Sequence, residues 1–180
     1  MYKHCATEES VRRQRQLETS LLELMLTTSY PQITISDICD RVGISRKSFY
    51  RYFTGKEGCL CALMDHAIFD GASYYLPGYS GNQAIRIIYE RFFQYWKDQH
   101  MLLDALSQNN LSMLLVERML VYTTQEEQEF RILYQNHLGE AHERSLFYIG
   151  GIMSLLLDWH QSGYKKSITQ MSKILEELVK

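Results

Sequence analysis

Proline is rare in this 180-residue chain, and long apolar runs are missing. The two prolines are Pro31 and Pro77, which leaves long windows in which helices can form. No run of about 18 apolar residues occurs, so we expect no membrane span. The stretch from Met1 to Ser10 has no apolar core, so we expect no signal peptide and a cytoplasmic protein.

Motifs of common enzymes and metal sites are also missing. No HExxH, GxSxG, Walker or dinucleotide-binding pattern occurs. His137 and His142 are five residues apart, a spacing that does not place two ligands on one helical face. No CxxC pair occurs among the four cysteines, which are Cys5, Cys39, Cys59 and Cys61. We therefore expect a protein that is not an enzyme and has no metal, no cofactor and no disulfide framework.

Apolar residues recur at helical spacing through most of the chain, and no useful length alternates with period two. The pattern predicts an all-α protein of about nine helices. Around the two short helices described next, the predicted helical ranges are 8–29, 56–74, 83–100, 101–106, 111–137 (one or two helices), 140–162 and 168–179. Glycine, proline and serine between residues 71 and 82 indicate a loop. We place a domain boundary between residues 1–56 and 57–180.

Residues 34–56 have the pattern of two short helices joined by a tight turn. Thr34 is placed to cap the first helix, with Asp37 as its capping-box partner. Gly43 is suited to end that helix, because glycine readily adopts the left-handed conformation of a C-terminal cap. Ser45 is placed to cap a second helix that starts at Arg46.

The second helix has one apolar and one basic face. Phe49, with Tyr52 or Phe53, is expected to be buried. The opposite face carries Arg46, Lys47, Ser48, Tyr50 and Arg51. This order of cap, glycine and basic helix is that of a DNA-binding helix-turn-helix. The alternative is an ordinary helical hairpin with a solvated basic face.

Charge is distributed unevenly in a way that fits DNA binding. Residues 1–56 carry nine Lys and Arg against six Asp and Glu, whereas the remainder carries ten against fifteen. A basic N-terminal third attached to an acidic body suits a protein that presents one end to phosphates.

The run from Ile38 to Glu57 resembles the DNA-binding signature of TetR-type transcriptional regulators. Tyr50 and Phe53, followed by Lys56, are the most specific part of the match. The resemblance implies a three-helix N-terminal DNA-binding domain on a helical domain that senses a ligand and dimerises. It also implies a ligand-responsive regulator, usually a repressor, that binds a palindromic operator on double-stranded DNA as a homodimer. The residues expected at DNA are Thr34, Ser36, Arg46, Lys47, Ser48, Tyr50, Arg51, Tyr52 and Lys56.

The competing interpretation is a TetR-like co-regulator that binds another regulator protein and no longer binds DNA. In that case the cations at Arg46, Lys47, Arg51 and Lys56 would be dispensable.

The segment from Ser145 to Gly163 resembles the C-terminal half of the same family, in which the last two helices pair with those of a second copy. Gly150 and Gly151 are unfavourable inside a helix by about 1 kcal/mol each. Close approach of another helix, from the same chain or a partner, would explain them. The expected dimer-interface residues are Gly150, Gly151, Ser154, Leu155, Asp158, Trp159, Ile174 and Leu175.

Aromatic residues are frequent in the predicted C-terminal helices. Pockets between helices are mostly apolar and aromatic, although most aromatic residues at helical spacing belong to the core. With the family resemblance, this favours a cavity for a small hydrophobic or aromatic effector. The candidate lining residues are Tyr89, Phe92, Phe93, Trp96, Phe130, Tyr134 and Tyr148.

Overall fold

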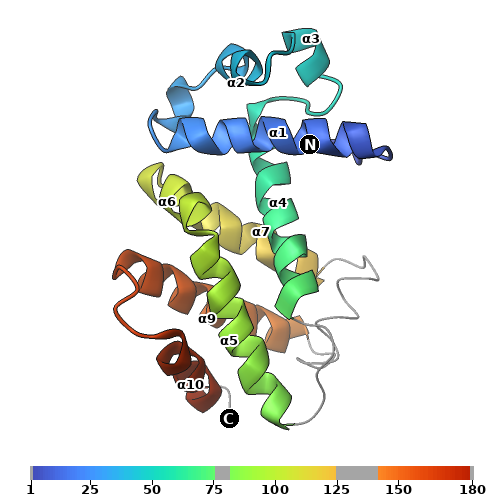
Figure 1. Cartoon of the computed structure of the whole chain (residues 1–180). Helices are drawn as coiled ribbons and strands as arrows, with labels where there is room; N and C mark the ends of the chain where they lie inside the picture. Colours follow the sequence, from blue (N-terminus) through green and yellow to red (C-terminus); the bar gives the residue numbers. More distant parts are fainter. Residues whose placement is uncertain (1, 76–81, 125–141, 179–180) are drawn as a thin grey trace. The chain divides into compact units, whose positions relative to one another are not determined.

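The computed structural model describes residues 2–75, 82–124 and 142–178 (Figure 1). These residues form nine α-helices and one short 3-10 helix, and they contain no strand beyond one isolated bridge. The all-α prediction is therefore confirmed. The helices are α1 (Glu8–Met25), η1 (Tyr30–Gln32), α2 (Ile35–Val42), α3 (Arg46–Phe49), α4 (Lys56–Tyr75), α5 (Asn82–Asp98), α6 (His100–Gln108), α7 (Ser112–Thr124), α9 (His142–Gln161) and α10 (Ile168–Leu178).

Local capping chemistry sets several of these helix ends. The Ser167 backbone N–H donates to Gln170 Oε1, and the Gln170 N–H donates to Ser167 Oγ, which forms a capping box at the start of α10. Gly163, with φ 70°, follows the end of α9. α1 ends at Met25, four residues before the predicted end. The Met25 carbonyl accepts a hydrogen bond from the side chain of Asn109 (3.0 Å) and does not continue the helix.

The chain divides into two compact units. The first comprises the described residues up to Ala67 together with Asp104–Leu111, and the second comprises Ile68–Leu103 with the described residues from Ser112 onward. Thus α4 contributes residues to both units, and the division lies eleven residues beyond the boundary expected at 56/57. Cys59, Leu60 and Met64 are buried, as expected of a helix segment that belongs to a core.

Asn109 explains why residues distant in sequence belong to the first unit. Its Nδ2 donates to the carbonyls of Met25 (3.0 Å) and Ala105 (2.7 Å), and its Oδ1 accepts from the Tyr30 N–H (2.6 Å). One amide side chain thus joins the C-terminal end of α1, the start of η1 and the last turn of α6.

In the second unit, α10 packs on α5 and α7 packs on α9. Its core includes Trp159, whose ring centroid lies 5.4 Å from that of Phe93 and 4.8 Å from that of Tyr164. In the described part of the chain, no helix combines the length and hydropathy that crossing a membrane requires.

Candidate nucleic-acid interface

The predicted capping box starts α2. Thr34 Oγ1 accepts from the Asp37 N–H (3.2 Å), and Asp37 Oδ2 accepts from the Thr34 N–H (2.7 Å) and hydroxyl (2.8 Å). The hydrogen bond from the Thr34 backbone, followed by that from its hydroxyl, lowers the pKa of Asp37. Because the Thr34 hydroxyl proton is committed to this cap, the structure gives Thr34 a folding role in addition to the expected phosphate contact.

The turn between α2 and α3 has the predicted geometry. Gly43 is left-handed, with φ 69° and ψ 38°, and the following Ile44 N–H donates to the Cys39 carbonyl (3.1 Å). Ser45 then caps α3 by accepting from the Ser48 N–H (3.2 Å). These contacts confirm the assignment of Gly43 and Ser45.

α3 is only four residues long and continues as a tight turn to Phe53. The Arg51 N–H donates to the Ser48 carbonyl and the Tyr52 N–H to the Phe49 carbonyl, which are three-residue spacings. Phe49 and Phe53 are 0% and 1% exposed, and their ring centroids are 5.1 Å apart. We call residues 46–53 the recognition element; the two phenylalanines anchor it to the first unit.

The solvent face of the recognition element is basic. Arg46, Lys47 and Arg51 are exposed, and Tyr50 is 46% exposed. No acidic residue occurs between Ile44 and Lys56. Ser48 and Tyr52 are half-buried at its edge, and Ser36 is half-buried on α2. The expected DNA-binding residues of this element are therefore grouped on a surface that the fold leaves accessible.

Lys56 has partners within the protein. Its Nζ donates to the carbonyls of Tyr30 and Ile33, both at 2.7 Å, and lies 4.4 Å from the centroid of the Tyr30 ring. A lysine at the start of a helix is unfavourable for the helix dipole. Here the two carbonyl oxygens carry negative partial charge and compensate for that effect. The structure thus gives Lys56 a role inside the first unit that the sequence did not reveal.

A polar hollow of about 330 Å³ adjoins the recognition element. The start of α1 contributes Ser10 and Arg13, and the recognition element contributes Ser48 and Arg51. Thr7, the N-cap of α1, also lines the hollow, and its capping pattern with Ser10 is a sequence signal that could have marked this place.

Three comparisons with known proteins bear on this geometry. The family model described as "Bacterial regulatory proteins, tetR family" matches residues 21–63, which contain α2, the turn, the recognition element and the start of α4. Residues 21–63 place the DNA-binding part of this chain in the TetR family of transcriptional regulators.

One relative in sequence is the HTH-type transcriptional regulator EthR of Mycolicibacterium smegmatis, which is 37% identical over 76 residues. That match covers 39% of this chain and 35% of EthR, so the chain matches about a third of the length of this curated relative.

Solved structures share the fold over nearly the whole chain. The fatty acid degradation regulator FadR from Bacillus halodurans has a TM-score of 0.64 at 16% identity, covering 98% of this chain and 96% of FadR. A TetR-family regulator from Syntrophomonas wolfei has a TM-score of 0.67 at 16% identity, covering 94% and 93%.

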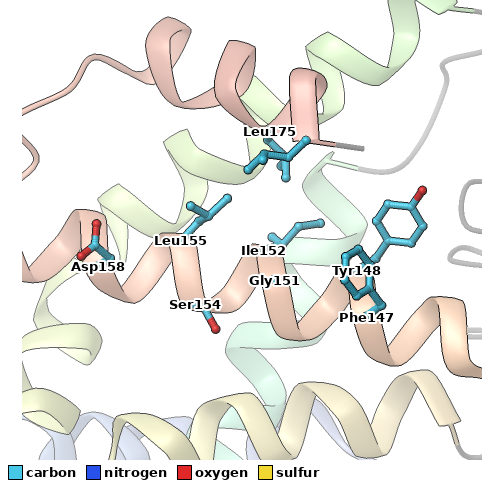
Figure 2. A pocket seen from close by; sticks show the side chains of 9 residues that line it. Phe147, Tyr148, Gly151, Ile152, Ser154, Leu155, Asp158 and Leu175 are labelled. Atoms are coloured by element: carbon cyan, nitrogen blue, oxygen red, sulfur yellow. The ribbon is translucent and has the colours of Figure 1, made fainter. Parts of the chain in front are cut away.

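A second candidate site is an apolar hollow of about 430 Å³ between α9 and α10 (Figure 2). Phe147 is 74% exposed and Leu178 is 63% exposed. Five expected dimer-interface residues line the hollow: Gly151, Ser154, Leu155, Asp158 and Leu175. The hollow also contains Tyr148, which was expected in an effector pocket.

The two glycines of α9 have open space beside them. Among the described residues, a Cβ atom built at Gly150 or Gly151 would meet nothing within 4 Å.

Trp159 has a different place from the one expected. It is 1% exposed, and its Nε1 donates to the Lys166 carbonyl (2.8 Å). Its ring is enclosed by Phe93 and Tyr164, so this side chain belongs to the core of its own protomer. Ile174 is half-buried on α10 and does not line the hollow.

The expected effector-pocket residues separate into three groups. Phe92, Phe93 and Trp96 are 6%, 0% and 0% exposed and pack as core. Tyr89 is half-buried, and burial, followed by the charges of Tyr148 and Glu176, raises its pKa to about 12. Phe130 and Tyr134 lie outside the described residues. Within the described ranges, no group of three His, Cys, Asp or Glu side chains is arranged to hold a metal ion.

Proposed function

We propose that this regulator binds a palindromic operator as a homodimer and represses transcription by occupying it. The observation that carries the proposal is the division of the recognition element into two faces. Phe49 and Phe53 anchor it, while Arg46, Lys47 and Arg51 project into solvent. A short helix held in this way suits the major groove, where arginine and lysine pair with guanine edges and phosphates.

The proposal assigns contacts according to which donors the fold leaves accessible. Arg46, Lys47 and Arg51 would contact bases or phosphates of the major groove, with Ser48, Tyr50 and Tyr52 beside them. Arg13 in the polar hollow would contact a neighbouring phosphate. Two such elements in a dimer would occupy half-sites one helical turn apart, roughly 34–36 Å.

The apolar hollow of α9 and α10 supports the dimer. Phe147 and Leu178 are exposed beside a hollow lined by apolar atoms, which is an unfavourable surface for a monomer. Burial against a second copy would remove this surface from water. Gly150 and Gly151 would allow the partner helix to approach closely. This interface would use residues of the second unit only.

The proposal also includes a small apolar or aromatic effector bound by the second unit, where Tyr89 and Tyr148 remain partly accessible. Such a ligand would act by binding one arrangement of the dimer more tightly than the other. Its test is release of the bound operator by candidate compounds at concentrations that leave the dimer intact.

The first experiment is selection of bound sequences from a pool of random duplexes at about 0.15 M salt. A palindromic enriched site with half-sites one turn apart is the expected result. Salt-sensitive binding without enrichment would mean that the basic face contacts only phosphates. No binding would refute DNA recognition and favour the co-regulator that binds another protein.

A matched pair of double variants then tests the assignment. Arg46→Ala/Arg51→Ala is expected to abolish sequence-specific binding and to reduce the salt dependence of the remaining binding. Lys165→Ala/Lys166→Ala removes the same charge from an exposed part of the second unit and is expected to bind as the wild type does. Equal binding by both variants would refute the assignment.

A further inference from the structure

Residues 2–5 form an extended segment, which we call the strap, that runs beside the end of the recognition element. The Lys3 N–H donates to the Tyr52 carbonyl (2.9 Å), and Tyr2 and Phe53 form an isolated antiparallel bridge. A single bridge of this kind is too small to be stable by itself. Other contacts must therefore hold the strap in place.

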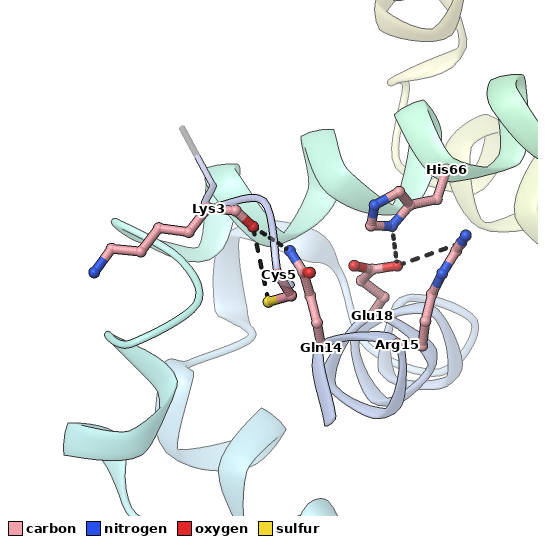
Figure 3. A network of polar contacts seen from close by, with 6 residues as sticks. All are labelled: Lys3, Cys5, Gln14, Arg15, Glu18 and His66. Carbon is pink, nitrogen blue, oxygen red and sulfur yellow. Dashed lines mark hydrogen bonds and ion pairs between the residues drawn. The ribbon is translucent and has the colours of Figure 1, made fainter. Parts of the chain in front are cut away.

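Side chains of α1 and α4 contact the strap; Figure 3 shows Gln14 against Lys3, and His66 beside Glu18. Gln14, which is 3% exposed, donates from Nε2 to the Lys3 carbonyl (3.2 Å). The Tyr2 ring meets the His66 ring edge-on, with centroids 5.7 Å apart. His66 Nδ1 lies 2.9 Å from Oε2 of Glu18, a residue of α1 whose side chain is buried. The strap is thus hydrogen-bonded to Gln14 of α1, and it contacts α4 through the His66 ring, which lies against Glu18.

The recognition element needs such an attachment. A helix of four residues has no stability of its own, because helix nucleation is unfavourable. Its first end is capped by Ser45, and its middle is anchored by Phe49. At the other end of the recognition element, the Tyr52 carbonyl lies beyond α3 and accepts from the Lys3 N–H.

We propose that the strap is a positioning device for DNA binding. By pairing the Tyr52 carbonyl, the Lys3 N–H fixes the orientation of the turn that carries Tyr50 and Arg51. The strap then raises operator affinity through the geometry of the recognition element, and it acts without a base contact of its own. This inference rests on the proposed DNA-binding function, and it also makes a claim about the free protein.

The effect is expected to be local. Lys3 and His4 are exposed, and Tyr2 and Cys5 are half-buried, so the strap adds little to the buried core. The first unit keeps its fully buried Leu17 and Leu21 without it. Loss of the strap should increase opening of residues 51–53 and leave the amides of α1 protected, because proteins open in separate local steps.

Two substitutions at one position isolate the hydrogen bond. Lys3→Pro removes both the N–H donor and the side-chain charge, whereas Lys3→Ala removes the charge and keeps the donor. Both are made in the full chain. The amide hydrogen exchange of Tyr52 and Phe53 is measured in the free protein, and affinity is measured for the selected operator.

Lys3→Pro is expected to increase exchange at Tyr52 and Phe53, and to weaken operator binding, each by about five-fold relative to Lys3→Ala, as the loss of one hydrogen bond predicts. Exchange at Leu17 and Leu21 should not change. If Lys3→Pro unfolds the unit as a whole, Gln14→Leu, which removes the donor to the Lys3 carbonyl, provides the second comparison.

Equal exchange at Tyr52 and Phe53 in the proline and alanine variants overturns the proposal. Faster exchange with unchanged operator affinity also overturns it, because the strap would then order a turn on which DNA binding does not depend. If the wild-type protein binds no duplex, the proposed function fails; the exchange measurement still decides whether the strap orders the turn.

Discussion

Replacing Lys56 by methionine separates an internal role of this lysine from a DNA contact. The ammonium group makes two short hydrogen bonds, to the carbonyls of Tyr30 and Ile33, and lies over the Tyr30 ring. Methionine keeps most of the apolar stem and removes all three interactions. The two carbonyls then lose a charged donor in a part-buried place.

The magnitude follows from these contacts. Hydrogen bonds to a charged donor contribute about 1.5 kcal/mol each at the lower end of their range, which suits a part-buried group. A cation–π contact at such a site adds about 0.5 kcal/mol. Lys56→Met should therefore reduce the free energy of unfolding by about 3.5 kcal/mol. With a urea dependence of about 2 kcal/mol per M, the unfolding midpoint falls by about 1.75 M.

The assay is urea unfolding followed by far-ultraviolet circular dichroism, without DNA. Lys47→Met is the matched control, because Lys47 is exposed on α3 and surface substitutions change stability by about 0.5 kcal/mol or less. If Lys56→Met and Lys47→Met unfold at the same urea concentration, the internal role is refuted. If Lys56→Met keeps its stability but loses operator affinity, Lys56 would instead be assigned to a contact with DNA phosphates.

Three further predictions concern other parts of the chain. Asp37→Asn should be less stable than the wild type near pH 6 in thermal unfolding. Because the pKa of Asp37 in the folded protein lies below its ordinary 3.8, this difference in stability should vanish as the pH falls through that lowered pKa. Phe53→Ala should lose about 3–5 kcal/mol in urea unfolding, whereas Tyr50→Ala at the exposed neighbouring site should lose less than about 1 kcal/mol; equal losses would contradict the anchoring role. Phe147→Glu should convert the proposed dimer into a monomer in sedimentation equilibrium, while Met113→Glu, at another exposed apolar site on α7, should leave the mass unchanged; an unchanged mass for both would exclude the α9–α10 hollow as the interface.

Features encoded by neighbouring residues could be predicted from the sequence. The caps at Thr34, Ser45 and Ser167 and the left-handed Gly43 each depend on residues within a few positions, and the structure has all of them. The burial of Phe49 follows from the same local periodicity. Such features need no knowledge of how helices pack.

Features that depend on packing could not be predicted. The Lys56 carbonyl partners lie 26 and 23 residues away in sequence, and a lysine that meets carbonyls carries the same sequence signal as one that meets phosphate. Trp159 was expected at a dimer interface from the family resemblance, but it is 1% exposed, and Phe93 and Tyr164 lie against its ring. The strap has no sequence signal, because one bridge and two hydrogen bonds leave no periodicity.

Asn109 has a consequence for the independence of the DNA-binding unit. Its side chain supplies hydrogen bonds to the Met25 carbonyl and the Tyr30 N–H from a segment more than forty residues beyond Ala67. A fragment that ends at residue 67 would expose both groups and would lack the fully buried Ala105 and Leu106. The DNA-binding end of this regulator is therefore not a separable module: transplanting it to another protein requires bringing the 104–111 segment along or redesigning the surface that it covers.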